Sequence, residues 1–143
     1  MDNGEQRIPD DLADLLTSDR IGHVSSIRPD GSIATHLMWI DFDGDNVLTS
    51  SPIGSRKGEN WRANPNVSVS VVDDDDDWRA LVIRGRIVEI RPDTDLEFID
   101  KMSNRYLGLP YRRRDSAREI FVIAPEYVKA TRGGWAKRSD RKP

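Results

Sequence analysis

The sequence contains no cysteine, and this absence excludes disulfide scaffolds, thiol catalysis and thiolate metal sites. Histidine is also scarce: the chain has only His23 and His36, so a histidine-based metal site would need carboxylates to complete it. No apolar run approaches the roughly 18 residues of a membrane span. The first residues, Met1 to Arg7, are polar and acidic and do not resemble a signal peptide. We therefore expect a cytoplasmic domain with no metal site and no membrane contact.

A large excess of positive charge is missing as well. The chain has 22 Lys and Arg against 25 Asp and Glu, whereas a protein held to nucleic acid by phosphate neutralisation is normally basic. Residues 1–102 have 11 basic and 21 acidic side chains, and residues 103–143 have 11 basic and 4 acidic ones. This uneven distribution of charge has two interpretations. The acidic and basic surfaces could attract each other within the fold or a dimer, or the basic region could bind an anionic ligand. We expect no nucleic-acid partner.

The length and the hydrophobic pattern predict one domain that is built mainly from strands. A chain of 143 residues with 36% apolar residues can form one core, which we assign to residues 1–136, and the basic end 137–143 is predicted to be disordered. Alternating apolar residues predict strands over 21–28, 32–42, 47–51, 67–72, 78–90, 119–123 and 127–131. Helices are expected over 8–19, 55–63 and 93–106. Because a flat sheet of such strands would expose its edges, we predict a mainly β fold, an antiparallel barrel with peripheral helices.

The most informative segment is 48–65, LTSSPIGSRKGENWRANP. A strand ends in three hydroxyl residues, and a loop leads to a helix whose first turn has a serine and two cations. The first amides of a helix lack internal partners and its dipole is positive there, so two cations are unfavourable unless an anion lies opposite. This pattern is typical of a phosphate site, although a solvated cation pair on a surface helix would give the same sequence. The residues are Thr49, Ser50, Ser51, Ser55, Arg56 and Lys57.

This segment and its neighbours resemble the pyridoxamine-phosphate-oxidase-like split β-barrel flavoproteins, and most closely the branch that uses the deazaflavin coenzyme F420. The resemblance rests on T-S-S, S-R-K and W-R-A-N-P, on the alternating V-S-V-S-V that follows, and on the first strand from Gly22 to Ile27. It extends over about residues 12–132. It implies the FMN-binding split barrel as the fold, and a homodimer with the cofactor at the dimer interface.

The resemblance also implies which residues hold the cofactor. The phosphate would lie against the strand end and the helix start, the second strand would lie along the ring system, and Trp78 would close over the cofactor. The implied cofactor-binding residues are His36, Leu37, Met38, Trp39, Thr49, Ser50, Ser51, Arg56, Lys57, Asn60 and Trp78. The chain ends in ATRGGW and a basic tail, in place of the oxidase's longer segment that grips pyridoxal phosphate, which argues against vitamin B6 as substrate.

Both F420 and FMN carry a ribityl-type phosphate, so the S-R-K segment does not distinguish them. F420 adds an oligoglutamate tail with several carboxylates, which needs cations outside the phosphate site. The basic third of the chain could supply them, and the candidates are Arg112, Arg113, Arg114, Lys129 and Arg132. The resemblance therefore favours F420, and FMN is the alternative.

The predicted function is an oxidoreductase that transfers a hydride from reduced F420 to a small organic acceptor. No serine pairs with a histidine and a carboxylate in a recognisable pattern, as expected where a cofactor supplies the chemistry. His36 is the catalytic candidate, as a donor to the substrate or the ring, and the alternative is a strand histidine that faces solvent or the interface. The acidic run 73–77 is interpreted as a solvated hairpin tip. The alternative functions are an FMN-dependent oxidoreductase or flavin reductase, and an F420-binding protein without turnover.

Overall fold

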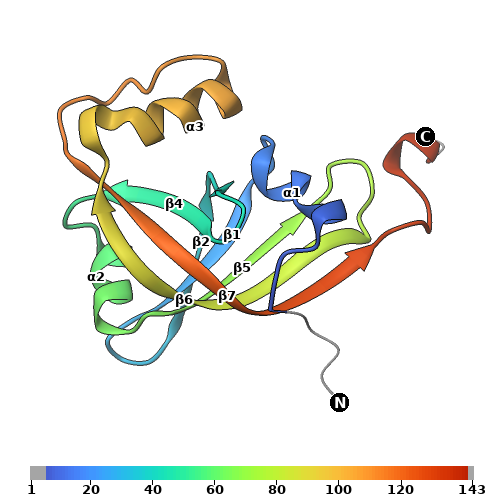
Figure 1. The fold of residues 1–143 in the computed structure, drawn as a ribbon, viewed down its shortest axis with the longest axis horizontal. Helices are drawn as coiled ribbons and strands as arrows, with labels where there is room; N and C mark the ends of the chain where they lie inside the picture. The colour runs from blue at the N-terminus through green and yellow to red at the C-terminus, as the bar shows by residue number, and fades with distance from the viewer. Residues whose placement is uncertain (1–5, 142–143) are drawn as a thin grey trace.

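The computed structural model describes residues 6–141, and its central feature is one antiparallel sheet of seven strands (Figure 1). The spatial order of the strands is β2-β1-β5-β6-β7-β4-β3, so β2 and β3 form the two edges. The strands are β1 (Gly22–Ile27), β2 (Ile33–Met38), β3 (Asp41–Phe42), β4 (Val47–Pro52), β5 (Asn66–Val72), β6 (Arg79–Pro92) and β7 (Arg118–Arg132).

The two edge strands follow each other in the chain. Only Trp39 and Ile40 separate β2 from β3, so the sheet must curl until its edges come close, yet no strand pairing joins them. The mainly β split barrel with peripheral helices is therefore confirmed, and a fully closed ring of strands is not formed. The strand expected over 32–42 is divided at this crossing, because its residues pass from one edge of the sheet to the other.

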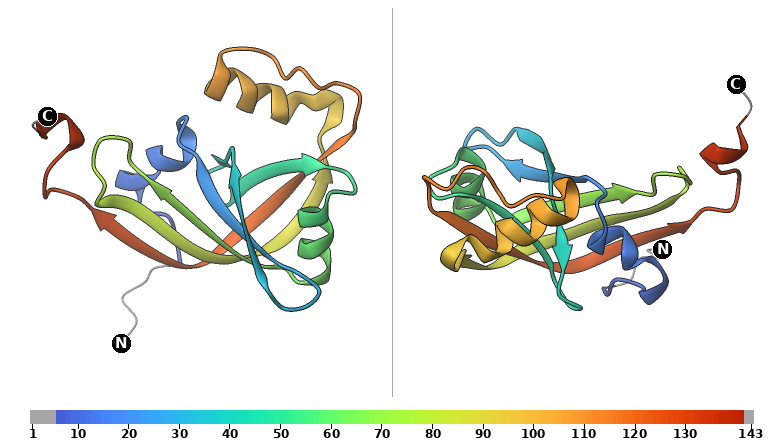
Figure 2. Two further views of the ribbon diagram at one scale, coloured as in Figure 1. Left: turned by 180° about the vertical axis from the view of Figure 1, so that it is seen from behind. Right: turned by 90° about the horizontal axis from the view of Figure 1, so that it is seen from above.

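Helical segments surround the barrel, except for the last, which lies beyond the tip of the β5–β6 hairpin (Figures 1 and 2). They are η1 (Asp10–Leu12), α1 (Asp14–Thr17), α2 (Arg56–Ala63), η2 (Thr94–Leu96), α3 (Glu97–Leu107) and η3 (Arg138–Asp140). α2 lies where the sequence predicts it: the Ser55 hydroxyl accepts from the Gly58 amide at 3.1 Å, and Pro65 follows the last turn. The helix expected over 8–19 is reduced to the short η1 and α1.

The helix expected over 93–106 begins later than predicted. Asp95 and Leu96 have φ angles of 56° and 58°, which interrupt the helical backbone before α3. The buried carboxylate of Asp93 then accepts hydrogen bonds from the amides of Phe98 at 2.8 Å and Ile99 at 3.0 Å. This side chain caps the first turn of α3 from outside the helix.

The strands expected over 119–123 and 127–131 form one long strand, β7, which pairs with β6 along nearly all of its length. The register shifts next to Gly85, which lies opposite Pro125. A Cβ atom at Gly85 would clash with the carbonyl oxygen of Ala124, so the close approach of the two strands requires glycine. The long strand β6 therefore has a bulge at this glycine.

Two apolar clusters hold the fold together. The larger one fills the barrel around Trp61 and Phe121, whose ring centroids lie 4.8 Å apart. The smaller one attaches α3 to the sheet and consists of Leu48, Phe98, Ile99, Met102, Ile120 and Val122. Buried Asp41 adds ion pairs of 2.9 Å to both Lys101 and Arg105 of α3. α3 is therefore fixed beside β4, where it covers one side of the split (Figure 1).

The opposite end of the molecule is formed by the β5–β6 hairpin and the C-terminal residues (Figure 2). Asp77 pairs with Arg138 at 2.8 Å and with Arg141 at 2.6 Å, and the Asp75 carboxylate accepts from the Ser139 amide at 2.9 Å. The domain limit at residue 136 and the disorder of 137–143 stay predictions, and residues 142–143 lie outside the described part.

Within residues 6–141, no helix has the length and hydrophobicity that a bilayer span requires. The cytoplasmic location stays a prediction. In the same part of the chain, no three His, Asp or Glu side chains are grouped as metal ligands would be.

Candidate functional site

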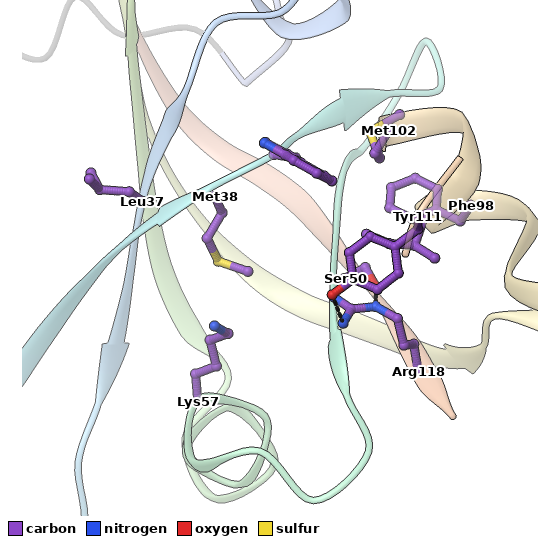
Figure 3. Close-up of a pocket in the computed structure, with 10 residues that line it drawn as sticks. Leu37, Met38, Ser50, Lys57, Phe98, Met102, Tyr111 and Arg118 are labelled. Atoms are coloured by element: carbon purple, nitrogen blue, oxygen red, sulfur yellow. Dashed lines mark hydrogen bonds between the residues drawn. The ribbon is translucent and has the colours of Figure 1, made fainter. Parts of the chain in front are cut away.

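A pocket of about 310 Å³ opens at the split of the barrel, between β2, β4, α2 and α3 (Figure 3). Most of its wall is apolar or aromatic, and its polar groups include two hydroxyls and two cations. The lining residues are Leu37, Met38, Trp39, Ser50, Lys57, Phe98, Ile99, Met102, Tyr111 and Arg118. Segments from four distant parts of the sequence thus form one site.

Lys57 enters the pocket from the first turn of α2, and in Figure 3 its side chain points toward Met38. Burial lowers the pKa of Lys57, and the positive charge of Arg118 lowers it further. No carboxylate in residues 6–141 lies within ion-pair distance of its amine. A cation next to the positive end of a helix is a favourable place for an anion such as a phosphate.

Arg118 enters from the start of β7 and is only 8% exposed. Its Nε donates to the Ser50 hydroxyl at 3.0 Å, and its Nη1 donates to the Tyr111 hydroxyl at 3.3 Å. The guanidinium carbon lies 5.1 Å from the centroid of the Tyr111 ring. Burial lowers the pKa of Arg118, although a guanidinium stays charged at any physiological pH.

The sequence analysis missed Arg118. It lies far along the chain from the S-R-K segment, and the pairing of β7 with β4 brings it there. Tyr111 belongs to the loop after α3, where its amide donates to the Asp100 carboxylate at 2.9 Å. The one available signal is weak: Arg118 directly precedes the apolar strand predicted over 119–123, and an arginine there is buried only where it has a partner or a ligand. The three α3 residues of the pocket, Phe98, Ile99 and Met102, also belong to the smaller apolar cluster.

The three hydroxyls of β4 have different roles, because successive strand residues face opposite sides. Ser50 lines the pocket, whereas Ser51 donates to the Ser55 hydroxyl at 2.6 Å and supports the α2 cap. Thr49 donates to the Trp39 carbonyl oxygen at 3.0 Å and braces the crossing between the edge strands. Arg56 is exposed and does not line the pocket.

His36 lies outside the pocket wall in a chain of hydrogen bonds. Asn60 Nδ2 donates to the Ser26 hydroxyl at 3.0 Å, and this hydroxyl lies 2.9 Å from His36 Nε2. Since Ser26 accepts from Asn60, its own proton is available for Nε2. Burial lowers the pKa of His36, as do the charges of Lys57 and Arg28, so the ring is neutral at pH 7. His36 is thus held as a neutral side chain, and a catalytic role for it stays a prediction.

Trp39 forms an aromatic wall with two tyrosines. Its ring stacks on Tyr106 at a centroid distance of 5.3 Å and meets Tyr111 edge to face at 6.3 Å. Tyr106 is fixed by its hydroxyl, which donates to the Arg20 carbonyl oxygen at 2.7 Å. Trp39 is therefore a rigid part of the pocket.

A smaller pocket of about 150 Å³ adjoins the first and shares Trp39 and Tyr111 with it. Arg112 and Arg113 line it, and neither forms an ion pair with residues 6–141. Arg114 is different, because it pairs with Asp100 at 2.8 Å. Only two of the three consecutive arginines are thus available to a ligand.

Trp78 belongs to the β5–β6 connection, and its side chain is 60% exposed. This hairpin lies at the far end of the molecule from α2 and α3 (Figures 1 and 2). The structure therefore brings together Leu37, Met38, Trp39, Ser50 and Lys57, and it places Trp78 away from them in the same chain. The cofactor contacts of all these residues stay predictions.

The chain matches the family model of pyridoxamine 5'-phosphate oxidase over residues 8–132. It is similar to a solved structure described as an F420 reductase, with 31% identity, a TM-score of 0.78, and coverage of 85% of this chain and 98% of that one.

Two more distant structures share the fold alone. A conserved hypothetical protein from Mycobacterium tuberculosis has 22% identity, a TM-score of 0.66, and coverage of 89% of this chain and 87% of that one. The general stress protein 26 from Bacillus anthracis has 20% identity, a TM-score of 0.63, and coverage of 86% and 92%. No curated protein matches the chain.

Proposed function

Since the chain belongs to the pyridoxamine 5'-phosphate oxidase family, we propose that it is an oxidoreductase that binds coenzyme F420 in the pocket at the barrel split. The observation that carries this proposal is Lys57, a partly buried cation without a carboxylate partner in residues 6–141, on the first turn of the capped helix α2. The similarity to an F420 reductase supports the choice of cofactor.

The residues of the pocket fit the groups that such a cofactor carries. Lys57 and the start of α2 would hold the phosphate, and the apolar edge formed by Leu37, Met38 and Trp39 would lie along the ring system. When bound, the reduced cofactor would supply a hydride to a small organic acceptor. The protein would orient the two molecules and exclude water, for which the rigid wall of Trp39 and Tyr106 is suited.

Arg112 and Arg113 favour F420 over FMN. They lie next to the main pocket without ion-pair partners in residues 6–141, where an oligoglutamate tail could contact them. Lys129 and Arg132 belong to the part of β7 that pairs with the start of β6, and Arg132 pairs with Asp11 at 2.8 Å. Within one chain we therefore assign the tail to the first two arginines only.

We further propose a homodimer with the cofactor between the copies. The position of Trp78 supports this arrangement, because within one chain its hairpin lies at the other end of the molecule. In the dimer, Trp78 would reach the cofactor from the second copy. Its side chain is available for such a contact, since it is 60% exposed.

Fluorescence titration with oxidised F420 and with FMN tests the proposal. We expect tighter binding of F420 and a loss of about tenfold or more in Lys57→Ala, as for a lost charge-assisted hydrogen bond. The exposed Arg86→Ala also removes one cation, and as the matched control it should bind F420 like the wild type. Tighter FMN binding would favour the flavin alternative, and F420 binding without oxidation of the reduced form by any acceptor would favour the non-catalytic one.

A further inference from the structure

Arg118 is a buried cation that forms no ion pair with residues 6–141. Its two hydrogen-bond partners, Ser50 and Tyr111, are neutral hydroxyls, and its Nη2 makes no hydrogen bond with residues 6–141. The negative charge of Asp93 acts on Arg118 only from beyond ion-pair distance, because its carboxylate is engaged by two amides at the start of α3. Because an unmatched buried charge is costly, this arrangement favours an anion in the pocket.

The guanidinium is held in a fixed orientation. Hydrogen bonds from Nε and Nη1 fix its plane, and the ring of Tyr111 lies against it at 5.1 Å. The Nη2 side remains for a ligand. A fixed planar fork with free N–H groups is suited to a carboxylate, which it can bind with two parallel hydrogen bonds.

Arg118 and Lys57 reach the pocket from different elements. Lys57 rises from α2 toward Met38, while Arg118 lies beside Ser50 and Tyr111 with the apolar side chains of α3 next to it (Figure 3). The surroundings of Lys57 suit a phosphate at a helix start. The surroundings of Arg118 suit an anionic group on a flat apolar body, which can pack between Phe98, Met102 and the aromatic wall.

We propose that Arg118 binds the carboxylate of the acceptor substrate, and that the acceptor is a conjugated or aromatic carboxylate. This proposal rests on the proposed function of the same pocket, with Lys57 assigned to the cofactor and Arg118 to the acceptor. It makes Arg118 a specificity-determining residue that the sequence motif does not contain.

Benzoate and benzamide test this assignment, because they have nearly the same shape and only benzoate is charged. Calorimetric titration of the F420-loaded protein should show a preference for benzoate of about tenfold, as for a charged hydrogen bond. Arg118→Gln should lose this preference while its affinity for F420 stays within about threefold of the wild type. Lys57→Ala should lose affinity for F420 and keep the preference for benzoate. For this variant the preference is measured by titrating both probes into the protein without cofactor.

Two outcomes would overturn the assignment. The first is equal binding of benzoate and benzamide by the wild type, which would show that the pocket has no carboxylate site. The second is a loss of F420 affinity in Arg118→Gln as large as that in Lys57→Ala, which would assign Arg118 to the cofactor phosphate. If Arg118→Gln does not fold, competition by inorganic phosphate on the wild type distinguishes the two sites. Phosphate should displace F420 and leave benzoate bound. Failure of the wild type to bind F420 would contradict the proposed function instead, and the titration without cofactor would still test Arg118.

Discussion

Carboxylates pair with the cations at the hairpin end of the molecule, whereas two cations inside the pocket at the other end have no such partner in residues 6–141. At the hairpin end, Arg79 contacts Asp73 at 2.9 Å and Asp14 at 2.6 Å, and Arg20 contacts Asp73 at 2.9 Å. At the pocket end, Lys57 and Arg118 lie in the same cavity without a carboxylate partner in residues 6–141. Matched charges of the first kind stabilise the fold, and unmatched cations of the second kind indicate where an anionic ligand binds.

The largest effect is expected where the matched charges are removed. Arg79→Ala would leave Asp14 without its partner and remove one of the two arginines of Asp73, so we expect the free energy of unfolding to fall by about 3 kcal/mol. Denaturation with urea measures this change. Affinity for F420 should fall less than in Lys57→Ala, because Arg79 lines neither pocket of the site.

Arg91→Ala is the control for this variant, since Arg91 is exposed and contacts Glu89 only at 3.6 Å. Its unfolding free energy should stay close to that of the wild type. Equal destabilisation by both substitutions would contradict the special role of the Arg79 contacts.

A smaller effect is expected from acid. Burial alone would raise the pKa of Asp73, but hydrogen bonds from Arg20, the Asp75 amide and Arg79 lower it to about 2. The folded-state pKa lies below the usual value of 3.8, so the stabilisation is complete above about pH 4 and is lost as the pH falls toward 2. This group should contribute about 2 kcal/mol to that loss.

Urea denaturation at several pH values measures this acid-dependent loss. The curve for Asp73→Asn should be less stable than the wild type near neutral pH and should fall less between pH 4 and pH 2. A wild-type curve that stays flat over this interval would contradict the assignment.

The smallest effect is expected from adding the missing carboxylate at the pocket end. Leu37 lines the pocket and is 72% exposed, so Leu37→Glu places a negative charge near Lys57 without a burial cost. We expect F420 affinity to fall by about tenfold through repulsion of the phosphate. Leu37→Gln has nearly the same shape as Leu37→Glu but no charge, and it should bind F420 more tightly than that variant. Equal losses of F420 affinity in both variants would show that the pocket cations do not determine this affinity.

Local patterns were sufficient for much of the fold and for part of the site. The α2 helix was predictable because Ser55 and Pro65 mark its ends, and the S-R-K segment identified Lys57. The alternation of strand residues could also have separated Ser50 from Ser51. Arg118 could not be predicted in the same way, because its place depends on the pairing of β4 with β7. The interruption before α3 likewise depends on Asp93, which caps the helix from outside it.

The split between β2 and β3 also affects the mechanical behaviour of the barrel. A closed ring of strands resists a change of its diameter, since any widening would stretch hydrogen bonds between neighbours. Here the two edge strands do not pair with each other, so widening along this line breaks no backbone pairing between strands. On the side where the pocket opens, the width of the barrel is therefore set by side chains, namely the Thr49 hydroxyl on the Trp39 carbonyl oxygen and the stack of Trp39 on Tyr106.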